Sequence, residues 1–227
     1  MYQILLKEWL THMDELHTYT ENSTEGNCIQ DSPAPQKPKY TWQQNTALYL
    51  HDMVIMLVAV MAVLMLFFRI IVVDGPSMEN TLLNGDYMLL VSNVFYRNPQ
   101  YGDIVVVSKQ AYDDGKPIVK RVIATEGQTV DIDFEEGIVY VDGVALEEPY
   151  TKTLTTLKEG NTFPQVVQPG MVFVMGDNRN NSKDSRSTQI GQVDKREVLG
   201  KVVFLLFPGT GMNGAQQRDF SRIGVMK

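Results

Sequence analysis

The chain has 227 residues, a formal net charge of −7 and a hydrophobic fraction of 44%. This length allows one or two domains, and the negative charge argues against nucleic acid as the main partner. The single cysteine, Cys28, excludes an intramolecular disulfide and a zinc cluster built on cysteines.

The N-terminal region divides into two segments. Residues 1–18 carry apolar side chains at helical spacing, which predicts a short amphipathic helix. These residues lack the basic start, the continuous apolar core and the cleavage site of a secretory signal peptide. Residues 19–46 are rich in Pro, Ser, Asn and Glu, a composition typical of a disordered linker.

An uncharged and almost wholly apolar run covers residues 53–68. As a helix this run would be about 24 Å long, which is short of the roughly 30 Å hydrocarbon core of a bilayer. We therefore predict a transmembrane anchor over residues 47–71, with Asp52 and Arg69 near the two interfaces. A buried core helix is the alternative, which we disfavour because a helix apolar on every face is hard to bury in a small protein.

Two lysines just before the span, Lys37 and Lys39, favour a cytoplasmic N-terminus. The sequence therefore predicts a single-pass protein of the cell membrane. Residues 19–46 would form a cytoplasmic linker, and residues 72–227 would lie outside the cytoplasm.

After the apolar run, the sequence changes to short β-branched segments separated by Gly, Asp and Pro. Asp142-Gly143 is typical of a hairpin turn. No long helical period occurs, so we predict a mostly β fold, with an antiparallel β domain over residues 72–227 behind one N-terminal transmembrane helix. The polar stretch 151–168 is expected to be an excursion. The predicted strands are residues 87–91, 103–107, 118–123, 129–133, 138–141, 171–175 and 202–206.

Ser77 is the first candidate functional residue, because it follows the apolar run in a Gly-Pro-Ser-Met turn, close to a membrane surface. A serine is a poor nucleophile until a base removes its proton. All three histidines, His12, His17 and His51, precede Ser77. We therefore looked for a different base in the segments that follow.

Lys120 is that candidate base, because it lies among aliphatic residues in a predicted strand. Alternation in the strand places Lys120 on one face with Ile118 and Val122, and Arg121 on the other. Burial would lower the pKa of the lysine from its usual value of about 10.4. A solvated edge strand is the alternative, since a Lys-Arg pair is common there.

The segment from Gly176 to Arg186 follows an apolar strand and is dense in polar side chains. Alone it reads as a surface loop. A calcium loop with Asp177, Asn178 and Asp184 is a weaker alternative, because the spacing does not match an EF-hand.

Taken together, these segments resemble the type I signal peptidases in their single-span Gram-positive form. The resemblance extends from the apolar span to Pro208, and its specificity lies in the combined order and spacing of the motifs rather than in any one of them. The matching segments after the anchor are Gly75–Leu82, Gly85–Val91, Gly102–Val106, Lys120–Ala124, Gly176–Arg186, Gly191–Val193 and Val198–Phe204.

The resemblance implies a membrane-bound serine endopeptidase that removes signal peptides from secreted preproteins by a Ser-Lys dyad. Ser77 would be the nucleophile and would donate its main-chain N–H to the oxyanion, and Lys120 would be the general base. No metal or cofactor would be needed. One departure concerns the second oxyanion donor, because Gly75 stands where some relatives carry a hydroxyl.

The resemblance also assigns supporting roles within the loop. Ser182 would orient Lys120 through a hydrogen bond, Asp184 and Arg186 would form an ion pair, and Asp177 would help to hold the loop. Asn180 is a second departure, because an acid is commoner at that position.

Four aliphatic residues near the dyad, Ile71, Val73, Met78 and Val119, would line shallow substrate pockets. Such pockets accept the small side chains of the Ala-x-Ala cleavage pattern. The implied partners are preproteins with signal peptides, the lipid bilayer and the protein-translocation machinery, with no nucleic acid.

Three other functions remain as alternatives. One is a peptidase dedicated to pilin or surface-protein assembly, or an accessory protein of the same family. A second is a Ser-Lys self-cleaving repressor, which the apolar span argues against. The third is an anchored binding protein, which the presence of both Ser77 and Lys120 argues against.

Overall fold

A computed structural model describes residues 42–214 and 217–226 of the chain. The predicted amphipathic helix over residues 1–18 and most of the predicted linker lie outside the described residues. Helix α2 spans Trp42–Phe67 and contains a segment, Thr46–Phe67, that is long and apolar enough to cross a membrane. No part of its most apolar stretch is buried, which contradicts the alternative of a core helix.

The structure corrects both predicted ends of the anchor. The helix begins at Trp42, inside the predicted linker, and ends at Phe67. Residues 68–71 belong instead to strand β1 (Phe68–Val72), which pairs antiparallel with β2 (Tyr87–Ser92) and sets Arg69 opposite Leu90. Arg69 therefore lies two positions beyond the end of α2, and its location near a membrane interface stays a prediction.

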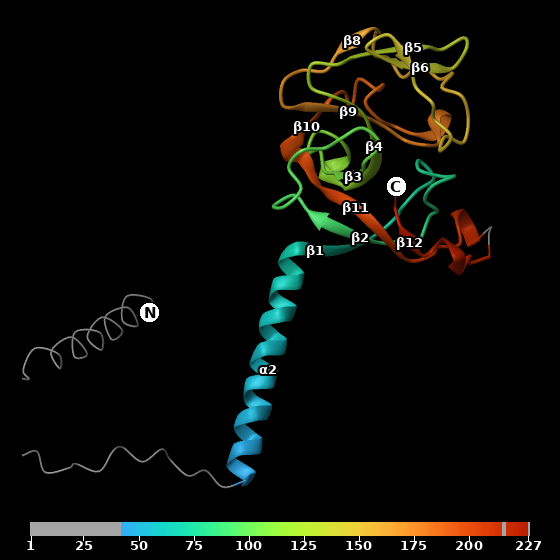
Figure 1. The fold of residues 1–227 in the computed structure, drawn as a ribbon. Helices are drawn as coiled ribbons and strands as arrows, with labels where there is room; N and C mark the ends of the chain where they lie inside the picture. The colour runs from blue at the N-terminus through green and yellow to red at the C-terminus, as the bar shows by residue number, and fades with distance from the viewer. Residues whose placement is uncertain (1–41, 215–216, 227) are drawn as a thin grey trace, which may run out of the picture. The chain divides into compact units, whose positions relative to one another are not determined.

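A large antiparallel sheet carries the segments that bear the candidate residues (Figure 1). Its eight strands run in the order β1-β2-β11-β3-β4-β9-β10, and β12 pairs with β11. β4 lies between β3 and β9, so the alternative of a solvated edge strand around Lys120 is wrong. The remaining strands are β3 (Ile104–Val107), β4 (Ile118–Thr125), β9 (Met171–Met175), β10 (Val193–Asp194), β11 (Val198–Phe207) and β12 (Gly224–Val225).

A smaller antiparallel sheet has the order β7-β6-β5-β8. Asp142 and Gly143 join β6 to β7 with positive φ angles of 53° and 79°, which confirms the predicted hairpin turn. Its strands are β5 (Thr129–Asp133), β6 (Ile138–Val141), β7 (Val144–Ala145) and β8 (Gln165–Val166). Short 3₁₀ helices are η1 (Asp113–Gly115), η2 (Arg179–Asn181), η3 (Lys195–Glu197), η4 (Met212–Gly214) and η5 (Phe220–Arg222).

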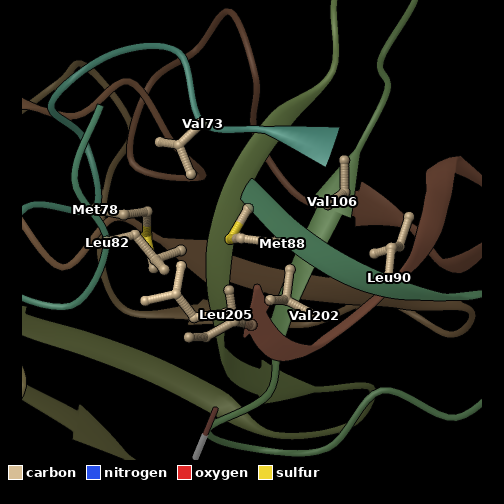
Figure 2. Packing of buried hydrophobic residues seen from close by; sticks show 9 residues of the cluster. Val73, Met78, Leu82, Met88, Leu90, Val106, Val202 and Leu205 are labelled. Atoms are coloured by element: carbon tan, nitrogen blue, oxygen red, sulfur yellow. The ribbon is translucent and has the colours of Figure 1, made fainter. Parts of the chain in front are cut away.

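The predicted mostly β fold class is therefore confirmed, and one of its hydrophobic cores lies beside the candidate nucleophile. Val73, Met78 and Leu82 come from the turn after β1 and pack with side chains of β2, β3 and β11 (Figure 2). Met78 is 1% exposed and Leu82 is fully buried. The buried side chains on both sides of Ser77 therefore fix the turn against the sheet.

Candidate active site

The turn that bears Ser77 is closed by hydrogen bonds that join residues before the serine to residues after it. Val73 N–H donates to the Asp86 carbonyl at 2.9 Å, and Gly75 N–H donates to Asn84 Oδ1 at 2.9 Å. Gly75 has a φ of +107°, a conformation that glycine adopts without steric cost. The backbone is thus held in a shape that leaves the hydroxyl of Ser77 facing β4.

Lys120 on β4 reaches this hydroxyl, because its Nζ lies 2.7 Å from Ser77 Oγ. The lysine is only 3% exposed. Burial lowers the pKa of Lys120 to about 8, although the nearby Asp184 carboxylate acts in the opposite direction. A substantial fraction of this lysine is therefore neutral at mildly alkaline pH, as a general base must be.

Asp184 is the centre of a buried network within the segment from Gly176 to Arg186. Its Oδ2 accepts a hydrogen bond from Gly176 N–H at 3.0 Å. Arg186 donates two hydrogen bonds of 2.8 Å to the same carboxylate, and the side chains of Asp184 and Arg186 are both fully buried. Burial by itself would raise the pKa of Asp184, but the hydrogen bonds and charge of Arg186, the Gly176 N–H and the charge of Lys120 together outweigh it and hold this pKa below its usual value. The ion pair implied by the resemblance is present.

Ser182 departs from its predicted role. The resemblance implied a hydrogen bond between Ser182 and Lys120, but Ser182 Oγ donates to Asp184 Oδ2 at 2.9 Å instead. No hydrogen bond joins Ser182 to Lys120 among the described residues. The ionised carboxylate of Asp184 is the stronger acceptor, so it takes the hydroxyl proton. Ser182 nevertheless lines the same cleft as Ser77 and Lys120.

Asp177 holds the loop through an ion pair with Arg121, which the sequence did not predict. Its carboxylate receives two hydrogen bonds from Arg121, at 2.9 and 2.7 Å, and both side chains are at most 3% exposed. Thr81 Oγ1, in the turn after Ser77, also donates to Asp177. Asp177 therefore links the loop, β4 and the nucleophile turn.

Asn178 is a further contact residue that the sequence analysis did not assign to the site. Its main-chain N–H donates to the Ser77 carbonyl at 3.0 Å, and its side-chain amide donates to the Pro76 carbonyl at 3.0 Å. Gly176 permits this approach, because a Cβ at that position would lie 2.5 Å from the Ser77 carbonyl oxygen and 2.2 Å from Ser182 Oγ. The spacing of motifs gave no signal for these contacts.

Asn180 explains one departure from the family pattern. Its Oδ1 accepts hydrogen bonds from the N–H groups of Thr156 and Leu157 at 3.2 and 3.1 Å, while its Nδ2 donates to the Leu154 carbonyl at 3.1 Å. An aspartate could accept the first two hydrogen bonds but could not donate the third. The amide therefore docks the predicted excursion onto the loop.

The calcium alternative does not fit the observed contacts. The carboxylates of Asp177 and Asp184 are each occupied by a guanidinium group, from Arg121 and Arg186 respectively. Within residues 42–214 and 217–226, no group of three or more His, Cys, Asp or Glu side chains is arranged to hold a metal ion. The loop is therefore built around buried ion pairs.

Two cavities meet at Ser77. A pocket of about 290 Å³ is lined by Ser77 together with all four predicted pocket residues, Ile71, Val73, Met78 and Val119. A second cleft, of about 440 Å³, is lined by Ser77, Lys120 and Ser182 among others. The structure thus places an apolar pocket and a more polar cleft next to one nucleophilic hydroxyl.

The chain is similar to known proteins over most of its length. Residues 46–207 match the family described as "Signal peptidase, peptidase S26". A protein named probable signal peptidase I-1 from Synechocystis is 38% identical over 192 residues, which cover 80% of this chain and 90% of that protein. Signal peptidase I T of Bacillus subtilis is 31% identical over 179 residues, which cover 74% of this chain and 90% of the relative.

A crystal structure of a signal peptidase I from Enterococcus faecalis also matches, at 30% sequence identity. The match covers 46% of this chain and 96% of that chain, with a TM-score of 0.37.

Proposed function

Since the chain belongs to the S26 family of signal peptidases and removes signal peptides as a serine peptidase, we propose that Ser77 is its nucleophile and Lys120 its general base. The observation that carries this assignment is the 2.7 Å separation between Lys120 Nζ and Ser77 Oγ. The burial of Lys120 and its lowered pKa supply the activation that a serine hydroxyl requires.

The proposed reaction proceeds by an acyl-enzyme. Neutral Lys120 accepts the proton of Ser77 Oγ as this oxygen attacks the scissile carbonyl carbon. The resulting ammonium then gives the proton to the leaving amine when the C–N bond breaks. Water hydrolyses the serine ester with Lys120 again acting as base, which restores the free hydroxyl.

The oxyanion of the tetrahedral intermediate would be held by the Ser77 main-chain N–H. This group makes no hydrogen bond to the described residues. Gly75 contributes no hydroxyl, and its own N–H is occupied by Asn84 Oδ1. We therefore assign one main-chain donor and leave Gly75 out of the oxyanion site.

The pocket lined by Ile71, Val73, Met78 and Val119 is proposed to bind the substrate residues before the scissile bond. Its volume is about 290 Å³ and its lining is mostly apolar, which suits the small side chains of an Ala-x-Ala site. Ser182, Asp177, Asp184 and Arg186 are proposed to support the dyad by fixing the loop beside it.

The protein acts on secreted preproteins that carry signal peptides, and α2 supplies one apolar helix of membrane-spanning length. We propose that α2 anchors the chain in the cell membrane, with residues 1–41 in the cytoplasm and residues 72–227 as an extracytoplasmic catalytic domain. The bilayer and the translocation machinery are the partners that this placement implies.

The alternative of a pilin or surface-protein assembly peptidase, or of an accessory protein, is not favoured, because the relatives carry the name signal peptidase I. The test is to incubate the detergent-solubilised full chain with a preprotein that contains an Ala-x-Ala site. We expect cleavage after the second alanine, and none with Ser77→Ala. Cleavage by the Ser77→Ala protein would refute the assignment.

A further inference from the structure

Glu159 has the one buried side-chain oxygen or nitrogen among the described residues that lacks a hydrogen-bond partner, its Oε2. The side chain is 3% exposed, and its other oxygen, Oε1, lies 3.3 Å from Lys183 Nζ. An unsatisfied buried acceptor is costly. Glu159 also lines the 440 Å³ cleft with Ser77 and Lys120, so a rotation of its carboxylate would bring Oε2 to a molecule bound in the cleft, which could supply the missing donor.

The backbone around Glu159 is fixed by the loop beside the dyad. Gly160 forms an antiparallel bridge with Ser187, and Asn161 N–H donates to the Arg186 carbonyl at 3.1 Å. The amide of Asn161 donates to the carbonyl of Ser185 at 2.9 Å. The carboxylate is therefore positioned by the same loop that carries Ser182, and it does not depend on a free surface segment.

The two cavities differ in which partner of the dyad they contain. Ser77 lines both, but Lys120 lines the cleft and is not among the residues that line the apolar pocket. Because Lys120 must hand its proton to the leaving amine, the leaving chain has to lie on the side of Lys120. This step rests on the proposed function, and it assigns the cleft to the residues after the scissile bond.

We propose that Glu159 is a substrate-binding residue whose Oε2 accepts a hydrogen bond from a main-chain N–H of the substrate after the scissile bond. A carboxylate is an acceptor only, and its hydrogen bonds with N–H donors are among the stronger ones. A main-chain donor suits a peptidase whose products have different N-terminal sequences, because every residue except proline offers it. The contact would align the leaving chain with Lys120.

The test uses the solubilised full chain and peptides with an Ala-x-Ala site. Each peptide carries one N-methyl group on the main chain, at the second, third or fourth residue after the scissile bond. At one of these positions, methylation should lower kcat/KM of the wild type by about tenfold, the loss expected for a hydrogen bond to a charged acceptor. In Glu159→Ala, the same methylation should change kcat/KM less than twofold.

Two variants separate binding from a structural role. Lys183→Gln removes the ion-pair partner of Glu159 Oε1, and in this variant kcat/KM should depend on methylation as it does in the wild type. If methylation no longer changed kcat/KM, the role of Glu159 would be to hold Lys183 rather than to bind the substrate. Lys158→Gln is the matched control on the same segment, since Lys158 lies over the Phe134 ring, 5.3 Å from its centroid, and does not line the cleft. It should cleave every peptide as the wild type does.

Several outcomes overturn the assignment. Methylation that has no effect at any position, or the same effect in Glu159→Ala, contradicts it. The wild type could instead prefer peptides with a lysine side chain at one position, and Glu159→Ala could lose this preference. That result would show that Glu159 binds a substrate cation rather than a main-chain N–H. Cleavage of the unmethylated peptide, and its loss in Ser77→Ala, test the proposed function separately, so failure of one is distinguishable from failure of the other.

Discussion

At the scale of single residues, the buried Lys120 links the stability of the fold to pH. Its pKa of about 8 in the folded protein lies below the ordinary value because burial disfavours the ammonium. Between pH 8 and about 10.4 the unfolded chain therefore binds more protons at this group, and its contribution to stability rises with pH over that window. At neutral pH, burial of the Lys120 ammonium lowers the stability of the folded protein.

The same pKa sets the pH dependence of the reaction. Because the neutral amine is the active form, kcat/KM should rise with pH through a midpoint near pH 8 and level off above it. A pH–rate profile on one peptide substrate measures this midpoint. A profile that stays flat from pH 6 to 10, with chemistry shown to be rate-limiting, would remove a titrating lysine from the mechanism.

Replacing either member of the dyad tests whether the two act as a unit. Ser77→Ala and Lys120→Ala should each abolish cleavage, and the double variant should be no worse than either single one. Lys120→Arg should also fail, because a guanidinium stays protonated. Circular dichroism checks that the variants remain folded. Near-normal turnover by Lys120→Arg would contradict the assigned base.

Gly176 offers a test of how tightly the loop approaches the nucleophile. The Cβ of an alanine would lie 2.2 Å from Ser182 Oγ and 2.5 Å from the Ser77 carbonyl oxygen, so the turn or the loop must shift. We expect Gly176→Ala to lower kcat by roughly a hundredfold, since displacements of about 1 Å near the reacting atoms can cost this much. Gly224→Ala is the control, because its Cβ would meet no atom within 4 Å and neither Gly176 nor Gly224 has a positive φ; equal losses in kcat would argue against a close-approach effect.

At the scale of elements, β-branched composition predicted the strands that are long enough to show it. All seven predicted strands correspond to observed ones, namely β2, β3, β4, β5, β6, β9 and β11. The missed strands β7, β8, β10 and β12 have two residues each, too few to stand out as β-branched segments. β1 was missed because its sequence, apolar except for Arg69, directly follows that of α2.

The site shows the same limit for contacts between distant segments. The resemblance to type I signal peptidases implied both the dyad, whose two residues are 43 positions apart, and the Asp184–Arg186 pair. The buried pair of Arg121 and Asp177 joins residues 56 positions apart, and no local pattern predicts it. The hydrogen bond expected between Ser182 and Lys120 is not formed, and Ser182 Oγ donates to Asp184 Oδ2 instead, because motif spacing does not give the distance between two side chains from different segments.

The Arg121–Asp177 pair should stabilise the arrangement of β4, the loop and the nucleophile turn. Asp177→Asn leaves a buried guanidinium without its counter-ion, and we expect a loss of about 3–5 kcal/mol in the free energy of unfolding. Asp194→Asn is the matched control, because it removes an ion pair with Arg196, whose side chain is 90% exposed, and should cost at most about 1 kcal/mol. Chemical denaturation of the solubilised protein, monitored by the circular dichroism of the β-sheet, gives the free energy of unfolding of both variants. Equal losses would mean that the buried pair has no special weight.

At the scale of the whole molecule, function depends on where the described domain lies relative to the bilayer. The helix α2 ends at Phe67 and Ser77 follows only ten positions later. Fully extended, ten residues span at most about 36 Å. With α2 in the bilayer, as proposed, Ser77 would therefore be tethered within reach of a membrane surface, where a substrate held by its own apolar signal sequence would present its cleavage site.

This placement predicts the accessibility of the single cysteine. Cys28 precedes α2 and should lie in the cytoplasm as a free thiol, because Lys37 and Lys39 favour retention of that side. In spheroplasts, a membrane-impermeant maleimide should label Cys28 only after lysis. A Val144→Cys variant that also carries Cys28→Ser is the control, because Val144 is 67% exposed in the small sheet and should be labelled without lysis. If Cys28 were labelled before lysis while the cysteine at position 144 was protected, the proposed orientation would be reversed. The dyad would then lie in the cytoplasm, where preproteins have not yet been translocated.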